Sequence, residues 1–524
     1  MDGISASRDS SSSRLHYLQQ VIHATDTTAR FGSAFRLNEV ISPPSSWGIP
    51  RGTPMPIFNP SIVSTTVPHF GEVFITTARI SNGPGCPHFQ NAEFNSLKSG
   101  VLRNELIIAL IDSECNVMDT TLVDFPDRFV ASYDGSTDVH RVEGPMDVRI
   151  FNGKGNDSWW ISFFAEYTEG KESGHRAVHF APLHLSLTAC NGESHSWRPN
   201  ATSTCMILHA GEHSDDCLEH CTSLGGDDCE ISKDYCICRR CQNITNSGLT
   251  TRYTRTQSKA RSLCIQRAYI HNDEVVSVGD TGRTEKNWQL IEVSTDLEEL
   301  WVHYSVQPSI KMRISLDWPE GVTRNGHPRP VRVASVALDS ATATWWDPNV
   351  IHRISNVRGG YCCVAVDLEW LPFDMKQFMA LNHPKHTKLL LGVGHMQRIR
   401  QLGDQMKGNR TRLEGIRNTR AYKQFFFLLA ADYPFTMLGA SPEFCFESGG
   451  RYSPSAQGPT CEAIQFISGL TLASSLVDGD KVDLVISYGI NDCEAIITRL
   501  DMYSVLGKLR PTANDLVDWV NDEV

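Results

Sequence analysis

Asp147 and Arg149 place a carboxylate and a guanidinium two residues apart. They follow the Gly144-Pro145 turn signal and lead into an apolar, strand-like run that ends at Phe151. An Asp at the start of a strand can donate or accept a proton, while an Arg beside it holds an anion. The same residues would also suit an ordinary loop with a surface salt bridge. The stretch therefore indicates either acid–base chemistry next to an anion site or a salt bridge alone.

The whole stretch from Glu143 to Phe151 resembles the G-P-E-D-P-R-[IL]-F signature of glycoside hydrolase family 130, the β-mannoside phosphorylases and their relatives. These proteins are five-bladed β-propellers. The resemblance implies that Asp147 is the general acid, which protonates the departing glycosidic oxygen through a sugar hydroxyl. Two positions differ, because Met146 replaces the family's Glu and Val148 replaces its Pro. The Asp-x-Arg pair is kept, but these two changes leave the reaction type open.

Three further segments are similar to the same family. Phe58-Asn59-Pro60-Ser61, with the run that ends in Arg79, resembles a first blade whose Asn and Arg line the sugar and phosphate pocket. Glu285-Lys286-Asn287-Trp288 repeats a string whose Lys and Asn face that pocket. Gly392-Val393-Gly394-His395 resembles a blade start, and His395 either binds a sugar hydroxyl or is structural. Taken without the family, these segments predict only turns and surface side chains.

The last match is the most extensive. Ile464-Gln465-Phe466-Ile467-Ser468-Gly469-Leu470 and then Asp483–Ala495 are similar to the closing blade of bacterial relatives. There, the Asp that corresponds to Asp492 holds mannose hydroxyls, whereas a hairpin turn with an Asp bonded to its own backbone explains the same residues locally. The resemblance implies no metal and no cofactor beyond phosphate or a sugar donor as co-substrate. Around the catalytic Asp147 it implies these substrate-binding residues: Asn59, Arg79, Arg149, Lys286, Asn287, His395, Tyr488 and Asp492.

Short β-branched and aromatic runs separated by turn residues must position these side chains. They predict an all-β protein, either a propeller or stacked sandwiches, and the resemblance selects a five-bladed β-propeller with loop inserts. We expect a tail or wrap-around arm at 1–50, the propeller at 51–510 with a Cys-rich insert at 190–262 and a charged insert at 399–420, and a tail at 511–524. The predicted strands are Val73–Ile80, Leu106–Asp112, Trp159–Glu166, Val178–Leu187, Leu290–Val293, Val331–Leu338, Tyr361–Leu368, Leu389–Val393, Phe425–Ala430 and Val482–Tyr488.

Composition excludes some classes of partner. With 524 residues, 40% of them hydrophobic and 21% charged, the chain is of ordinary globular composition. Its net charge of −12 argues against a nucleic-acid partner, because no basic stripe is available to neutralise phosphates. No apolar run reaches the roughly 18 residues that a membrane span needs. The Ser-rich start of the chain lacks the apolar core of a signal peptide.

The cysteines bear on the compartment. Six of the sixteen fall within Cys217–Cys241, in a segment with too few apolar residues to fold by burial. Either disulfides or zinc would cross-link such an insert, and the irregular spacing favours disulfides. We therefore expect a secretory lumen or the cell exterior, with the cytoplasm as the alternative.

These observations lead to a functional expectation. The chain is expected to be an inverting carbohydrate-active enzyme, a glycoside phosphorylase or glycosyltransferase, that moves a mannosyl-type unit between β-mannoside glycans and phosphate or an activated donor. Its partner would be an oligosaccharide or glycan substrate. A catalytically degenerate glycan-binding propeller and a β-mannoside hydrolase remain the alternatives. The oligomeric state is not indicated by the sequence.

Overall fold

The structure is a computed structural model. It describes these residues: 35–41, 56–81, 104–113, 117–126, 129, 145–153, 158–167, 175–190, 203–212, 228–231, 235–243, 262–278, 288–293, 299–306, 310–315, 329–330, 332–338, 354–399, 420–441, 444, 446, 465–474, 482–490 and 493–511. The chain divides into two compact units, Ala189–Ser262 and the remainder. Charged residues 400–419 of the predicted insert, and the C-terminal tail from 512 onward, lie outside the described residues.

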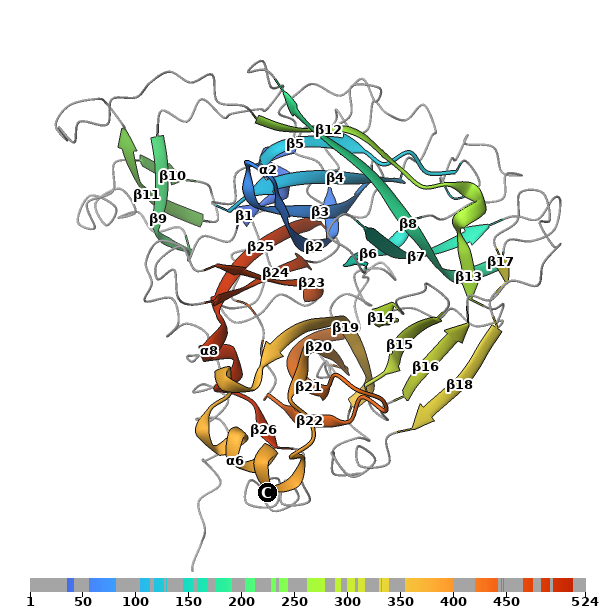
Figure 1. Cartoon of the computed structure of the whole chain (residues 1–524). Coiled ribbons are helices and arrows are strands. Elements are labelled where there is room, and N and C mark those ends of the chain that lie inside the picture. The colour runs from blue at the N-terminus through green and yellow to red at the C-terminus, as the bar shows by residue number, and fades with distance from the viewer. Residues whose placement is uncertain are drawn as a thin grey trace, which may run out of the picture. The chain divides into compact units, whose positions relative to one another are not determined.

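The larger unit is a five-bladed β-propeller made of small antiparallel sheets (Figure 1). The prediction of an all-β propeller is therefore confirmed, and each predicted run overlaps a strand, although Leu368 belongs to a 3-10 helix. Blade 1 contains β2 (Ile57–Val67), β3 (Gly71–Ser81), β4 (Asn104–Asp112) and β5 (Val117–Leu122). Blade 2 contains β6 (Met146–Asn152), β7 (Trp159–Tyr167), β8 (His175–Cys190) and β13 (Val276–Val278), with β12 (Ser262–Tyr269) and β17 (Arg329–Pro330) added to it.

The other three blades follow in chain order. Blade 3 contains β14 (Gln289–Val293), β15 (Glu299–Ser305), β16 (Ile310–Ser315) and β18 (Arg332–Leu338). Blade 4 contains β19 (Ile354–Asp367), β20 (Lys388–Ile399), β21 (Arg420–Ala430) and β22 (Met437–Ala440), with β26 (Arg510–Pro511) at its edge. Blade 5 contains β23 (Gln465–Ser474), β24 (Val482–Ile490), β25 (Glu494–Asp501) and the two-residue β1 (Phe35–Arg36).

Helices are few in the described residues. They are α2 (Leu37–Val40), α6 (Phe373–Asn382), α8 (Met502–Leu506) and the short 3-10 helices η5 (Asn272–Glu274) and η7 (Leu368–Trp370). None of these helices is long and apolar enough to cross a membrane.

The smaller unit contains a three-stranded antiparallel sheet. Its strands are β9 (Ser203–Glu212), β10 (Asp228–Ile231) and β11 (Tyr235–Asn243), in the order β10-β11-β9. The side chains of the cysteines in Cys217–Cys241 lie outside the described residues, so their cross-linking stays a prediction. Cys190 and Cys264, at the borders of the insert, are joined by a disulfide.

The blades pack face to face, so their central strands are buried on both sides. In β21 the run Phe425 to Ala430 is buried throughout, and β24 is buried from Leu484 to Ile490. Such strands are continuous apolar runs rather than alternating ones, since neither face meets water. The first strands of the blades, β2, β6, β14, β19 and β23, are the innermost ones: β2 contacts β6 and β23, β23 contacts β19, and β19 contacts β14.

Blade 5 is completed by residues from the other end of the chain. Phe35 and Arg36 pair with Ile497 and Ile496 of β25. The Asn38 side chain then donates a hydrogen bond to the Cys493 carbonyl and accepts one from the Ala495 backbone N–H, both at 2.9 Å. This segment, which falls in the range predicted as a tail or wrap-around arm, therefore supplies the outer strand of the last blade.

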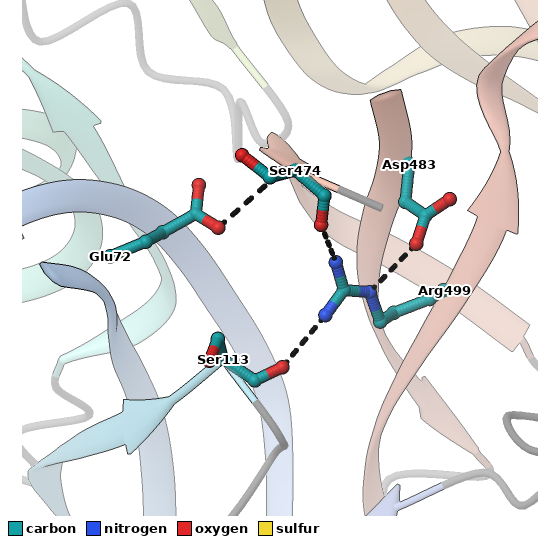
Figure 2. Close-up of polar contacts among 5 residues, drawn as sticks. All are labelled: Glu72, Ser113, Ser474, Asp483 and Arg499. Atoms are coloured by element: carbon teal, nitrogen blue, oxygen red, sulfur yellow. Dashed lines mark hydrogen bonds and ion pairs between the residues drawn. The ribbon is translucent and has the colours of Figure 1, made fainter. Parts of the chain in front are cut away.

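Hydrogen bonds of Arg499 and Glu72 join blade 5 to blade 1 (Figure 2). Arg499 of β25 donates to Asp483 Oδ2 at 3.2 Å, to the Ser474 carbonyl at 2.6 Å and to the Ser113 carbonyl, just after β4, at 2.7 Å. Glu72 of β3 accepts from the Ser474 backbone N–H at 3.3 Å. One nearly buried guanidinium thus bridges the two blades at which the ring closes.

Candidate functional site

Each innermost strand carries an irregularity that changes the direction of its side chains. A bulge inserts a residue, bends the strand and re-aims side chains, and bulges are common next to functional sites. The register shifts fall between Phe58 and Ser61 in β2, Met146 and Arg149 in β6, Leu290 and Glu292 in β14, Gly359 and Tyr361 in β19, and Ile467 and Gly469 in β23. Two of these irregularities lie at Asn59 and Asp147.

Asn59 and Asp147 occupy two of these bulges and meet across the boundary between blades 1 and 2. Their φ angles are 51° and 50°, in the left-handed region. Asn and Asp tolerate this region better than other residues with side chains, although it still costs free energy. Asn59 Nδ2 donates a hydrogen bond of 2.9 Å to Asp147 Oδ1. Two left-handed backbone conformations therefore direct an amide and a carboxylate to one point, and such conformations are enriched at functional sites.

Arg149 lies two residues further along β6 and is only 1% exposed. Its Nη1 donates to the Trp288 carbonyl, immediately before β14, at 2.8 Å. Its guanidinium carbon lies 5.4 Å from the centre of the Phe466 ring of β23. Burial lowers the pKa of Arg149 to about 10, while the nearby Asp147 carboxylate and Tyr361 phenol act to raise it. The guanidinium is therefore still charged at neutral pH and contacts blades 3 and 5 from blade 2.

Buried hydrogen bonds connect the innermost strands of different blades next to Asn59 and Asp147. The Tyr361 hydroxyl of blade 4 donates to the Ile150 carbonyl at 2.9 Å, and the Ile150 N–H donates to Ser61 Oγ of blade 1 at 3.1 Å. The hydroxyls of Ser468 and Ser487 both donate to the Pro60 carbonyl, at 2.5 and 2.7 Å. Burial raises the pKa of Tyr361, so its hydroxyl stays a neutral donor. These bonds hold the residues that directly follow Asn59 in β2 and the third residue after Asp147 in β6.

Two glycines allow the strands to approach this closely. A Cβ added at Gly359 would collide with the Gln289 side chain, and one at Gly360 would lie 2.7 Å from the Ile467 carbonyl. Gln289 itself is fully buried and donates from Nε2 to the Val393 carbonyl at 2.9 Å. The Arg358-Gly359-Gly360 segment thus serves close packing between blades 3, 4 and 5.

A cavity of about 250 Å³ lies elsewhere on the same strands. On β2 and β6, the residues that line it begin four positions after Asn59 and Asp147 in the sequence. None of the predicted site residues lines it. Its walls are Val63, Ser64, Phe151, Asn152, Leu290, Ile291, Tyr361, the disulfide-bonded Cys362 and Cys363, Val364, Ala365, Leu470, Thr471 and Leu472. The candidate site is therefore defined by the bonds at Asn59, Asp147 and Arg149 and not by this cavity.

The other predicted residues differ in their placement. Arg79, on β3, lies with its guanidinium carbon 4.8 Å from the centre of the Phe58 ring, and Phe58 directly precedes Asn59. His395 is buried, with the rings of Tyr422 and Phe466 each 5.2 Å from its own. Tyr488 is buried too and stacks on Phe446 at 4.5 Å.

The structure therefore brings Asn59, Asp147 and Arg149 together directly. Arg79 is linked to them through Phe58, and His395 through the Phe466 ring that it shares with Arg149. The predicted site residues Lys286, Asn287 and Asp492 lie outside the described residues.

Sequence reasoning did not single out the side chains that support this arrangement. Gln465 donates to the Phe446 carbonyl and accepts from the Phe446 N–H at 2.8 Å, which holds Phe446 against Tyr488. Phe466, next in the chain, contacts both Arg149 and His395. Both Gln465 and Phe466 stand in the matched segment Ile464–Leu470, so that motif was the available signal. No local pattern marks Phe446.

No family model and no curated protein matches the chain. Solved structures of similar fold include a mannose phosphorylase from Leishmania mexicana in complex with a phosphate ion, at 10% identity and a TM-score of 0.35, covering 95% of this chain and 97% of that one. A glycosyl hydrolase from Bacteroides ovatus is 11% identical, with a TM-score of 0.35 and coverage of 92% and 97%. A GDP-Man-dependent mannosyltransferase from Leishmania mexicana is 9% identical, with a TM-score of 0.32 and coverage of 85% and 84%. Similarity at this level carries no information about the activity of this chain.

Proposed function

We propose that this chain is a carbohydrate-active enzyme that transfers a mannosyl-type unit, with inversion, between β-mannoside glycans and phosphate or an activated sugar donor. The observation that carries the proposal is the hydrogen bond from Asn59 to Asp147 at two strained bulges. It falls where the sequence resembles the family 130 signature. A carboxylate held in one orientation by a hydrogen bond suits proton transfer to a leaving oxygen.

One general acid is enough for this reaction. Phosphate is itself a nucleophile and needs cations to hold it, whereas inverting hydrolysis requires a second carboxylate to activate water. In the proposed mechanism Asp147 gives its proton, through a sugar hydroxyl, to the departing glycosidic oxygen, and phosphate attacks the anomeric carbon from the opposite face. Lys286 and Arg79 would hold the anion. Asn59, Asn287 and Asp492 would contact the sugar, and the buried His395 and Tyr488 would hold the aromatic rings behind the site in place.

A glycan-binding propeller without activity is the second candidate. Met146 and Val148, which replace the family's Glu and Pro, are both buried in this structure. The positions that flank Asp147 therefore serve packing, and the stretch lacks the second charge of the family signature. Retention of Asp147 and of its bond to Asn59 favours the enzyme.

Product analysis separates these candidates. The purified protein is incubated with manno-oligosaccharides and phosphate, with mannose 1-phosphate, and with GDP-mannose, each with and without an acceptor glycan, and products are identified by mass spectrometry. The proposal expects mannose 1-phosphate and a shortened glycan from the first mixture, or an extended glycan from one of the donors. Free mannose in the absence of phosphate supports a hydrolase. Glycan binding with no product from any mixture overturns the enzyme and supports the binding protein.

The compartment is part of the proposal. We place the chain in a secretory lumen or outside the cell, because the Cys190–Cys264 disulfide persists in oxidising surroundings and is rare in the cytosol. Alkylation of freshly lysed source cells, before any exposure to air, would show whether these two thiols are protected. Free thiols at both positions would favour the cytoplasm instead.

A further inference from the structure

We infer that Arg149 is a positioning residue that fixes Asp147 relative to the chain at Trp288, and not one of the cations that contact the transferred anion. The inference rests on the proposed function and deepens it, since the resemblance alone assigns Arg149 to the anion. Three observations support this inference. Arg149 is buried, it donates a hydrogen bond to a backbone carbonyl, and that carbonyl belongs to Trp288, which follows Lys286 and Asn287 in the sequence.

Burial argues against direct contact with an anion. Arg149 is 1% exposed, and its guanidinium lies over the Phe466 ring. A phosphate brought to this guanidinium would have to displace the surrounding walls and lose its own hydration at the same time. Arginines that bind phosphate present their planar fork to the ligand in two parallel bonds. Here Nη1 of the fork is already bonded to the Trp288 carbonyl.

The hydrogen bond connects the two halves of the proposed site. Trp288 directly follows Lys286 and Asn287, the residues proposed to hold the anion and the sugar. Asp147 lies two residues before Arg149 on β6 and interacts with it electrostatically. The bond to Trp288 spans 139 residues of sequence, so one rigid guanidinium sets the distance between the acid on blade 2 and the segment that leads into blade 3. Misplacement of a reacting group by about 1 Å can cost on the order of a hundredfold in rate.

Lysine tests this role because it keeps the charge but not the planar fork. Arg149→Lys should lower kcat by about a hundredfold and leave the apparent constant for phosphate within about threefold, since positioning is lost but no anion contact is. Arg499→Lys is the matched control. It changes another nearly buried arginine with backbone-carbonyl partners, at the boundary of blades 1 and 5, and should leave kcat within about threefold.

A readout independent of turnover is hydrogen–deuterium exchange by mass spectrometry. Arg149→Lys should raise exchange about tenfold or more in the peptides that cover Met146–Asn152 and Trp288–Val293, and Arg499→Lys should not. If Arg149→Lys fails to fold, Arg149→Met replaces it, because Met fills the space of the side-chain stem but cannot donate to the Trp288 carbonyl, and the same fall in kcat and rise in exchange are expected. A wild-type crystal soaked with phosphate adds a direct view, with phosphate expected beyond hydrogen-bond distance of Arg149.

The kinetic, crystallographic and exchange results can each contradict the inference. An apparent constant for phosphate that rises tenfold with kcat unchanged, or a phosphate oxygen bonded to Arg149, overturns the inference. Unchanged exchange in both peptides also overturns it. If wild type shows no turnover at all, the proposed function fails, and the exchange data alone decide whether Arg149 holds the two segments together.

Discussion

Replacing Asn59 by Ala and by Gly separates two contributions of this residue. Both changes remove the amide that donates 2.9 Å to Asp147 Oδ1. A hydrogen bond to a charged group contributes about 1.5–3 kcal/mol. The φ of 51° adds a second term for Ala alone, because a left-handed conformation costs a residue with a Cβ about 1–2 kcal/mol, whereas Gly adopts it freely. Gly loses about 0.5–1 kcal/mol to the greater entropy of its unfolded chain.

The two variants should therefore be similar in activity and different in stability. Because both release one oxygen of Asp147, kcat should fall by about tenfold or more in each. Asn59→Ala should lower the free energy of unfolding by about 0.5–1 kcal/mol more than Asn59→Gly does. Urea unfolding followed by tryptophan fluorescence gives the stabilities, and the product assay gives kcat. Wild-type activity in both variants would refute the idea that this bond orients the acid, and equal stability of the two would refute the assigned backbone strain.

Four further predictions follow from the site and its surroundings. Asp147→Asn should lower transfer activity by at least about a hundredfold with the fold intact, because only the proton is lost; a circular dichroism spectrum like that of wild type is the control. Lys286→Ala should raise the apparent constant for phosphate or donor more than it lowers turnover, and a pure loss of kcat in steady-state kinetics would contradict an anion-binding role. Burial raises the pKa of the Glu72 carboxyl above its ordinary 4.5, so the stability that this group contributes is present below that pH and is lost as the pH rises through the folded pKa. Glu72→Gln should therefore gain stability relative to wild type as the pH rises above 4.5, which urea titrations at a series of pH values check, and a difference that does not change with pH would contradict this. Finally, intact-mass analysis after alkylation without reductant should find the thiols of Cys217–Cys241 blocked, and six free thiols or one bound zinc ion would exclude disulfides there.

The strands were predictable because their signal is local. Runs such as Phe425–Ala430 are apolar at every position, and such runs are typical of strands buried on both faces, which a propeller provides. The pairing of the blades was not predictable in this way. The two-residue β1 has no pattern that distinguishes it from the rest of a Ser-rich segment, and its partners in β25 lie at the far end of the chain.

The candidate site shows the same division. Asp147 was identified from a motif, and Asn59 from a turn signal together with the resemblance. That the two are hydrogen-bonded depends on backbone angles at both bulges and on a separation of 88 residues, which no local pattern encodes. Arg149 was predicted either to hold an anion or to form a surface salt bridge. Its burial follows from Trp288 and Phe466, which approach it from two other blades.

The way in which blade 5 is closed has a consequence for the synthesis of the protein. Asn38 bonds to Cys493, which follows it by 455 residues. At ribosomal rates of 5–20 residues per second, roughly 20–90 s pass between the appearance of these two partners. Throughout that interval Leu37 and Ile41, which end up buried, lack the blade 5 members of their core cluster, such as Ala495 and Ile497. Four blades can assemble during translation, but the ring cannot close until β25 has left the ribosome. The growing chain therefore exposes an apolar segment and an open sheet edge for most of its synthesis, which is when it is most prone to bind a chaperone or to aggregate.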